Sequence, residues 1–286
     1  MRAIAGGLFL FALILGIQGR ERHSARASIA PRRPPRALIA DDADHDGLPD
    51  ALEAALATRF APIVILDAHE ANRPASIGWL LARIGRTDPG TSGFPAWLRP
   101  GSPDPRDWVT YVHVYPRTDG FINVQYWFFY PYNDGPLFFD HDADWEHITV
   151  EVDPSGEPRG VAFAQHGNNH PGVFRAWPIA RKVGEHPVVL SARGTHASYP
   201  DQSSLNWFEH VSACTAVAGC ADPIWRTWDA GGLVNVGERG AQLEAGGFRQ
   251  ALAYAGRWGG AGQFLRSRPA PRGPLHQRGF VIDGFN

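Results

Sequence analysis

The sequence is short of lysine, methionine and cysteine. Its 286 residues include one methionine, two cysteines and 27 basic side chains, of which all but Lys182 are arginines. An arginine bias of this kind is typical of a GC-rich genome, as in many bacteria, and says little about function. The formal net charge is −2. Because no cluster of basic residues is present, we expect no nucleic-acid partner, and we expect a monomer.

Short catalytic signatures are also missing. The chain contains no H-E-x-x-H, G-x-S-x-G, phosphate-binding loop or C-x-x-C motif. His69 and Glu70 begin the zincin pattern, but its second histidine is absent. Cys214 and Cys220 form an isolated close pair, which in an exported protein predicts one short disulfide loop. The sequence therefore leaves open whether the protein is an enzyme.

The N-terminal region has the pattern of an export signal. Arg2 precedes an apolar run over residues 4–17, which is too short for a comfortable membrane span, and A-R-A at 25–27 fits a cleavage site. We expect a signal peptide over 1–27, with an uncleaved anchor as the alternative, and a secreted or extracytoplasmic protein. Residues 28–40 are rich in proline and arginine and predict a linker.

The rest of the chain predicts a mainly β fold. Runs that alternate with a period of two are separated by turn residues and not by helix-length crossovers, which favours an antiparallel sheet or sandwich with long loops. A few helices are expected at its periphery, and residues 59–286 are expected to form one domain. The predicted strands are 108–116, 121–132, 145–153, 159–167 and 186–194. A short helix is predicted after the acidic loop 42–53, and further helices are predicted over 74–85 and within 204–211 and 248–256.

The segment 41–58 carries a calcium-loop pattern before its helix. The residues from Asp42 to Glu53 fit D-x-D-x-D-G-x-x-D-x-x-E, in which Gly47 permits the sharp turn. The alternative is a solvated acidic turn that caps a helix. The spacing favours calcium, held for a structural purpose by the carboxylates and one backbone carbonyl of Asp42, Asp44, Asp46, Leu48, Asp50 and Glu53.

A second acidic cluster precedes a predicted strand, in the sequence FFDHDADWEHITVEV from residue 138. Asp144 and Glu146 have the parity of the apolar residues that follow, so both should point to the inner side. Two desolvated carboxylates repel unless a cation lies between them. His141 and either Asn133 or Asp134 would complete a divalent-cation site, for calcium or magnesium. An ion-pair network with Arg193 or Arg175 is the open alternative.

Two further predicted strands end at histidine and glycine. His166 follows one, and His196 follows the other. Converging strand ends would place both histidines in one polar pocket with the acidic cluster and Trp145.

Several segments together resemble a known family. YPRTDGFINVQYWFFYPYN, DADWEHITVEVD, AQHG, HPVVLSARGTHASYP and AGRWGG follow in the order found in the family of yeast vacuolar protein sorting-associated protein 62. The resemblance runs from about residue 59 to residue 260, and it implies no defined biochemical activity.

The H-x-x-D-W-E core is also similar to the signature of the necrosis- and ethylene-inducing cytolysins. That resemblance implies a β-sandwich whose divalent cation is held by His141, Asp144, Glu146 and an upstream aspartate at Asn133 or Asp134. Those cytolysins bind a head-group sugar and damage plant membranes. Here Asp140 replaces their glycine, and Asp142 and Ala143 replace their Arg-His pair, so the resemblance extends to the cation site and not to toxin activity.

Three functions follow from these patterns. The first is a cation-centred pocket that binds a glycan or a lipid head group. The second is a surface protein that its cations only stabilise. The third is a metal-assisted hydrolase with Glu146 or His166 as the base.

Overall fold

The computed structural model describes residues 41–136, 139–166, 171–211, 224–229, 231–237, 248–261 and 268–283. All of them belong to one unit, residues 38–286. The expected signal peptide, linker and disulfide lie outside the described residues. No helix within the described part of the chain is both long and apolar enough to cross a membrane.

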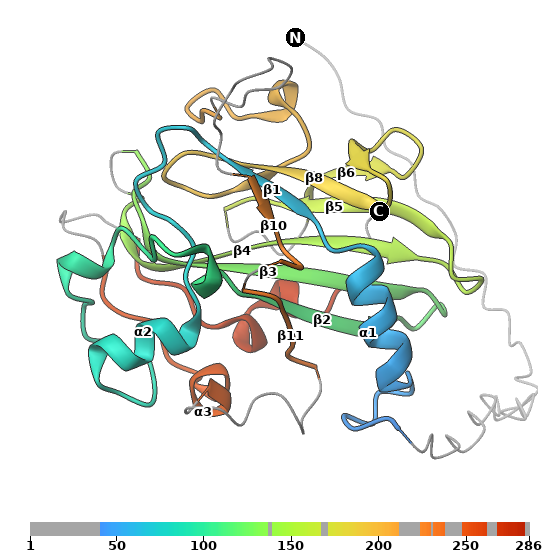
Figure 1. Ribbon diagram of the computed structural model, residues 1–286, viewed down its shortest axis with the longest axis horizontal. Coiled ribbons are helices and arrows are strands. Elements are labelled where there is room, and N and C mark those ends of the chain that lie inside the picture. The colour runs from blue at the N-terminus through green and yellow to red at the C-terminus, as the bar shows by residue number, and fades with distance from the viewer. Residues whose placement is uncertain are drawn as a thin grey trace, which may run out of the picture. The chain divides into compact units, whose positions relative to one another are not determined.

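Eleven strands and a few helices make up the described fold (Figure 1). The strands are β1 (Ile63–Leu66), β2 (Thr110–Pro116), β3 (Ile122–Asn133), β4 (His141–Val152), β5 (Pro158–Ala164), β6 (Pro171–Ala176), β7 (Lys182–Val183), β8 (His186–Ser191), β9 (Ser198–Tyr199), β10 (Ile224–Arg226) and β11 (Leu233–Asn235). The helices are α1 (Asp50–Arg59), α2 (Ile77–Ile84) and α3 (Phe248–Ala253), with short 3-10 turns η1 (Ala96–Leu98), η2 (Pro105–Asp107), η3 (Gln202–Ser204), η5 (Pro274–His276) and η6 (Arg278–Phe280).

The larger sheet has the order β11-β2-β3-β4-β5-β6. Its strands from β2 to β6 pair with their sequence neighbours in antiparallel register. The turn between β4 and β5 contains Gly156, whose φ of 87° suits glycine. These consecutive pairings confirm the antiparallel meander that the alternating sequence pattern predicts.

The smaller sheet has the order β10-β1-β8-β7, with β9 paired to β8. Here β1 and β8 run parallel, as do β11 and β2 in the larger sheet. The sandwich is therefore confirmed, but it is not purely antiparallel. Parallel neighbours need long connections, and local sequence patterns do not reveal which distant segments pair.

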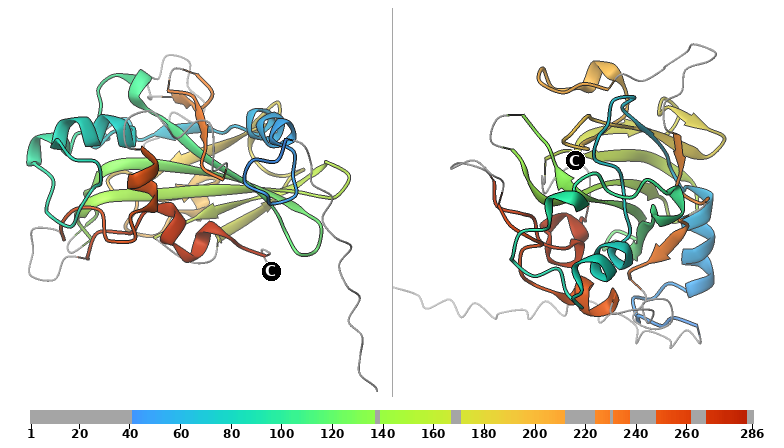
Figure 2. Two further views of the ribbon diagram at one scale, coloured as in Figure 1. Left: turned by 90° about the horizontal axis from the view of Figure 1, so that it is seen from below. Right: turned by 60° about the vertical axis from the view of Figure 1, so that its left-hand side comes forward.

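The two sheets bury a shared apolar core. Alternate residues of β4, from Ile148 to Val152, pack with Val64 of β1, Val189 of β8 and Phe60 after α1. The opposite face of the larger sheet is covered by α2, α3 and C-terminal segments, through residues such as Trp127 and Trp258. Figure 2 shows α1 and the red C-terminal segment on opposite sides of that sheet.

Two expectations about local structure need correction. The segment 204–211 is not helical: η3 ends at Ser204, and a turn follows in which the Glu209 N–H donates to the Asn206 carbonyl. The side chains of Asn206 and Glu209 point inward to polar partners, which a surface helix would not allow. The strand expected over 145–153 begins earlier, at His141, because its charged first residues pair with β3.

Candidate functional site

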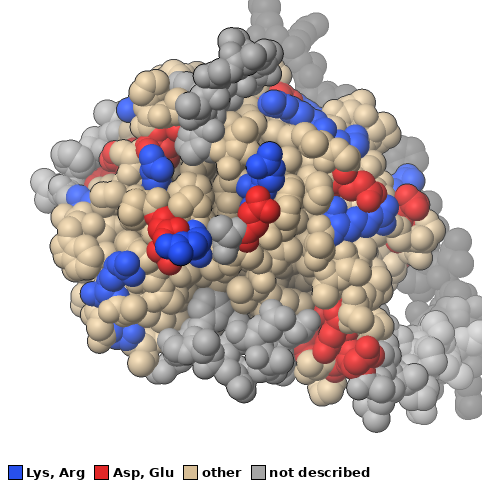
Figure 3. All heavy atoms as spheres, in the orientation of Figure 1, with Lys and Arg blue, Asp and Glu red and all other residues tan. Residues whose placement is uncertain are grey.

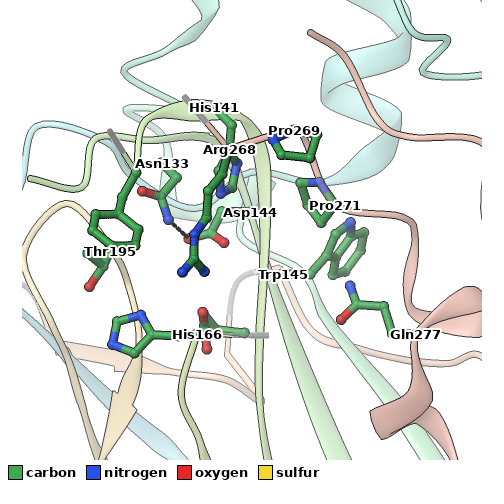
Figure 4. Close-up of a pocket in the computed structure, with 12 residues that line it drawn as sticks. Asn133, His141, Asp144, Trp145, His166, Thr195, Arg268, Pro269, Pro271 and Gln277 are labelled. Atoms are coloured by element: carbon green, nitrogen blue, oxygen red, sulfur yellow. Dashed lines mark hydrogen bonds between the residues drawn. The ribbon is translucent and has the colours of Figure 1, made fainter. Parts of the chain in front are cut away.

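A cavity lies where β4 extends beyond its neighbour β5. Pairing between these strands starts at Ile148, so in the described structure the segment from His141 to His147 pairs with β3 and with no strand on its other side, apart from one bridge to Ala261. The cavity has a volume of about 150 Å³. Figure 4 shows the residues around it. Its lining consists of Asn133, Phe139, His141, Asp144, Trp145, Glu146, His166, Thr195, Arg268, Pro269, Pro271 and Gln277.

Asp144 and Glu146 lie on the same face of β4, as the strand parity predicts. They pair with Tyr130 and Phe128 of β3, whose side chains belong to the core between the sheets. Both carboxylates therefore enter the same cavity at the end of this core. No arginine of the described residues lies within 4.0 Å of either one, since Arg175 pairs with Asp201 instead. These two acids therefore do not form the expected ion pairs with Arg193 or Arg175, although Asp144 pairs with His196.

Glu146 is the least compensated charge in the cavity. Its side chain is buried, with 4% of the residue exposed, and it has no hydrogen-bond partner among the described residues. Burial, with further repulsion from Asp144 and Glu209, raises the pKa of Glu146 well above its ordinary value. The carboxyl group therefore either holds a proton or requires a cation.

Asp144, by contrast, has two donors. Its Oδ2 atom lies 2.9 Å from Nδ1 of His196 and accepts a hydrogen bond from Nδ2 of Asn133 at 3.2 Å (Figure 4 shows the second bond). These contacts fix the orientation of the Asp144 carboxylate at the cavity wall.

His196 supports Asp144 from behind the cavity and does not line it. Its Nδ1 faces the carboxylate, and its Nε2 lies 3.0 Å from the carbonyl of Asn72, so both nitrogens act as donors and the ring is an imidazolium. Burial opposes this charge, yet Glu70 and Asp144 together raise the pKa of His196 to about 9. The ring also stacks on Tyr130, with centroids 3.7 Å apart. The sequence indicated His196 but gave no sign of Glu70 as its second counter-ion.

His141 presents one nitrogen to the cavity. Its Nδ1 lies 2.8 Å from the carbonyl of Ala143 and 3.2 Å from that of Asp142, so Nδ1 donates to these carbonyls and Nε2 is the nitrogen left to bind a ligand. A metal-binding histidine is commonly oriented in this way by a carbonyl behind it.

The two upstream candidates differ in position. Asn133 lines the cavity with Asp144, but its Oδ1 accepts from the Gly135 N–H, so the amide orients its neighbours. Asp134 lines a different cavity, of about 310 Å³, together with Glu70, Arg193 and His210. The structure thus brings together Asn133, His141, Asp144 and Glu146, and it places Asp134 apart from them.

His166 enters the cavity as expected, and a buried acid holds it. Nε2 of His166 lies 3.1 Å from Oε1 of Glu209. Glu209 also accepts from Thr195 Oγ1 at 2.7 Å and from the Tyr199 hydroxyl. Burial opposes the charge of Glu209, but these donors lower its pKa. The sequence gave no signal for Glu209, because the expected helix hid it.

Strained backbone is concentrated around this cavity. Of the four described non-glycine residues with positive φ, three are Ala143, His166 and His196, at 53°, 58° and 53°. Such conformations cost about 1 kcal/mol or more each for residues with a Cβ, and they cluster at functional sites.

Arg268 is the charged residue of the cavity lining that the sequence did not indicate. Its side chain reaches into the ring of lining residues beside Asp144 (Figure 4). Its guanidinium carbon lies 4.5 Å from the centroid of Phe139. It comes from the glycine-rich C-terminal segment, where no pattern distinguishes it from the other arginines.

The remaining residues of the acidic stretch have structural partners. Asp142 Oδ2 accepts from the N–H groups of Phe94 and Gly260, at 2.7 and 2.9 Å. The Tyr132 hydroxyl donates to Asp140 at 3.2 Å. His147 is buried and stacks on Trp127, and burial lowers its pKa to about 3. These side chains do not enter the cavity.

The loop at 42–53 gathers its carboxylates at the start of α1. Ligand oxygens of Asp42, Asp44 and Asp46 all lie within 4.8 Å of one another, which no other trio of acids, histidines or cysteines achieves among the described residues. His141, Asp144 and Glu146 share a cavity without being gathered so closely. Burial and the neighbouring Asp42 and Asp50 raise the pKa of Asp44.

The geometry of this loop matches the calcium-loop pattern at several points. Gly47 has a φ of 101°, its N–H donates to Asp42 Oδ2, and Glu53 is fully buried in α1. Glu53 also accepts a hydrogen bond from Asn235 of β11, at 3.2 Å. The acidic side chains form the red patch at the lower right of Figure 3.

The fold and this site define a β-sandwich protein with a buried acidic cavity at one strand end. No family model matches the chain. The sequence is 30% identical over 105 residues to vacuolar protein sorting-associated protein 62 of Saccharomyces cerevisiae. This match covers 31% of this chain and 22% of that protein. The putative vacuolar protein sorting-associated protein TDA6 of the same yeast is 28% identical over 107 residues, with 30% and 23% covered. The match thus spans less than a quarter of either relative.

Solved structures similar to this chain include a protein described as a toxin fold for microbial attack and plant defense. That likeness has a TM-score of 0.47 and 17% identity, and it covers 81% of this chain and 90% of the other. Another is NLPPya in complex with glucosamine, with a TM-score of 0.41, 16% identity, and 69% and 78% covered.

Proposed function

We propose that this protein acts outside the cytoplasm and binds a divalent cation, calcium or magnesium, in the cavity at the end of β4. The cation in turn binds the hydroxyl groups of a glycan or of a lipid head group. The proposal is carried by one observation, the buried carboxylate of Glu146 with no partner among the described residues. An unpaired buried charge is strongly unfavourable, and a divalent cation beside Asp144 compensates it.

The side chains that would hold the ion are Asp144 and Glu146, with Nε2 of His141. Hard cations prefer carboxylate oxygens, and a neutral imidazole is acceptable to several divalent metals. Asn133 and His196 act behind them by fixing the Asp144 carboxylate. Because the three ligands are not yet gathered as closely as the 42–46 trio, we expect them to draw together on binding.

The 42–53 loop is proposed as a separate calcium site with a stabilising role. Its oxygen donors would tie the start of α1 to β11 through Glu53 and Asn235. An ion that binds only the folded state stabilises it by mass action.

A metal-assisted hydrolase is the second candidate, and one contact favours it. The pairing of Glu209 with Nε2 of His166 at 3.1 Å leaves the other ring nitrogen of a cavity histidine as a potential base. Turnover of glycoside or phosphoester substrates, lost on His166→Ala, would support this candidate.

The deciding experiment is metal analysis of the purified protein beside Glu146→Gln. We expect the variant to lose one bound divalent ion and to lose cation-dependent binding on a glycan array or to liposomes. Glu157→Gln is the matched control, because it removes a carboxylate from the β4–β5 turn, at the opposite end of β4 from the cavity and outside the cavity lining. An unchanged ion content in Glu146→Gln would refute the cation site. Loss of the ion and a lower melting temperature, with neither ligand binding nor turnover in the wild type, would leave a purely stabilising role.

A further inference from the structure

Arg268 brings a positive charge to the acidic cavity, and the proposed cation site does not use it. We propose that the ligand is a sugar ring bearing an anionic group, a carboxylate or a phosphate, and that Arg268 binds this group. The inference rests on the proposed function, since the cation is taken to bind the hydroxyl groups of the same ligand.

The first support is the lack of an acceptor for Arg268. Its only interaction within the described residues is the stack of its guanidinium on Phe139, at 4.5 Å. A guanidinium that stacks by its face keeps the N–H donors along its edge available. These donors match the paired oxygens of a carboxylate or phosphate.

The second support is the position of the two carboxylates. Asp144 and Glu146 line the same cavity, yet neither lies within 4.0 Å of the guanidinium. Asp144 Oδ2 is already engaged by His196 and Asn133. Arg268 therefore enters an acidic cavity without closing an ion pair there, which leaves a cationic edge for a ligand.

The third support is the size and lining of the space. A volume of about 150 Å³ is below the roughly 300–1,000 Å³ of pockets for drug-sized ligands and suits one small ring. Phe139, Pro269 and Pro271 supply apolar surface for the C–H faces of such a ring, and Gln277 adds a polar group. A neutral sugar would offer hydroxyl acceptors to Arg268 but no charge to compensate its guanidinium.

The test is calorimetric titration of the full chain with glucose, glucuronate and glucose 6-phosphate, with calcium and with chelator. Arg268→Gln is compared with Arg272→Gln, which removes a nearby exposed arginine outside the cavity lining. We expect one or both anionic sugars to bind at least about tenfold more tightly than glucose, as expected for a charged hydrogen bond. Arg268→Gln should abolish that preference, and Arg272→Gln should retain it. The two anions distinguish a uronate from a phosphorylated head group.

Equal affinity for all three sugars, or a preference that survives in Arg268→Gln, would overturn the inference and leave the cation proposal intact. Binding of the anions that requires Arg268 but persists in chelator would support the role of Arg268 and count against the cation. Failure of every sugar to bind the wild type in calcium would overturn the inference.

Discussion

Nδ1 of His196 lies 2.9 Å from Oδ2 of Asp144, and the same ring lies 3.7 Å from Oε1 of Glu70. One buried imidazolium thus compensates two acids, one of which belongs to the cavity. His196→Gln should destabilise the protein by roughly 3–5 kcal/mol, because it leaves buried carboxylates without their counter-ion. Urea unfolding measures this loss.

A double variant separates charge from packing. In His196→Gln with Glu70→Gln, one uncompensated carboxylate is removed, so the loss should be smaller than in His196→Gln alone. His186→Gln is the control, since His186 is half-buried, donates to the Ala61 carbonyl and has no carboxylate oxygen within 4.0 Å among the described residues. A loss below about 1 kcal/mol in His196→Gln would show that the ring is neutral.

Glu146→Gln should have opposite effects with and without cation. In chelator the variant should be more stable than wild type, because it removes a carboxyl group whose charge is disfavoured by burial and by Asp144 and Glu209. At a calcium concentration of about 100 times Kd, wild type should gain about 2.7 kcal/mol from the cavity ion, and the variant should gain nothing. Both proteins are best compared in an Asp44→Asn background, so that the loop does not contribute.

Asp44→Asn should remove the loop ion without affecting the cavity. Asp44 supplies one of the three oxygens gathered within 4.8 Å, and a neutral amide oxygen binds calcium more weakly than a carboxylate. Metal analysis should find one ion fewer than in wild type, and none in the double variant with Glu146→Gln. If the double variant kept an ion, a third site or a different ligand set would be required.

His113 should make the protein sensitive to acid. It is buried between Tyr115 and Phe280, and burial lowers its pKa to about 3. Between that value and about 6.5, the ordinary pKa of histidine, the unfolded chain takes up a proton that the folded chain does not. His113 alone should therefore lower the unfolding free energy by about 1.4 kcal/mol for each pH unit below about 6.5, and buried His147 should add a similar slope.

His113→Phe is the matching variant, because phenylalanine keeps the stack and cannot take up the proton. Its stability profile between pH 6.5 and pH 4.5 should be flatter than that of wild type by the slope of one group. Parallel profiles would mean that His113 is protonated in the folded protein.

Local sequence patterns predicted the central strands and much of the acidic site. The period-two sequence pattern predicted β2, β3, β5 and β8, because successive side chains of a strand point to opposite faces of the sheet and meet different neighbours. Parity placed Asp144 and Glu146 together for the same reason. The beginning of β4 was missed, since its charged residues resemble a turn until their pairing partners on β3 are known.

The parts that escaped prediction are contacts between distant segments. Glu70, Glu209 and Arg268 reach the site from three separate regions of the chain, and none belongs to a spacing pattern with His196 or Asp144. The parallel pairing of β1 with β8 is similar, because it depends on tertiary packing and not on either strand alone. Local sequence patterns therefore located the acids of the cavity but not the distant residues that surround them.

The wall contributed by Arg268, Pro269, Pro271 and Gln277 has a consequence for biosynthesis. These residues are synthesised more than a hundred positions after β3 and β4. The cavity around the acids at the start of β4 therefore lacks one wall until synthesis of the chain is nearly finished. Binding of an ion or a sugar would then distinguish chains whose C-terminal segment has packed against the cavity from chains in which it has not.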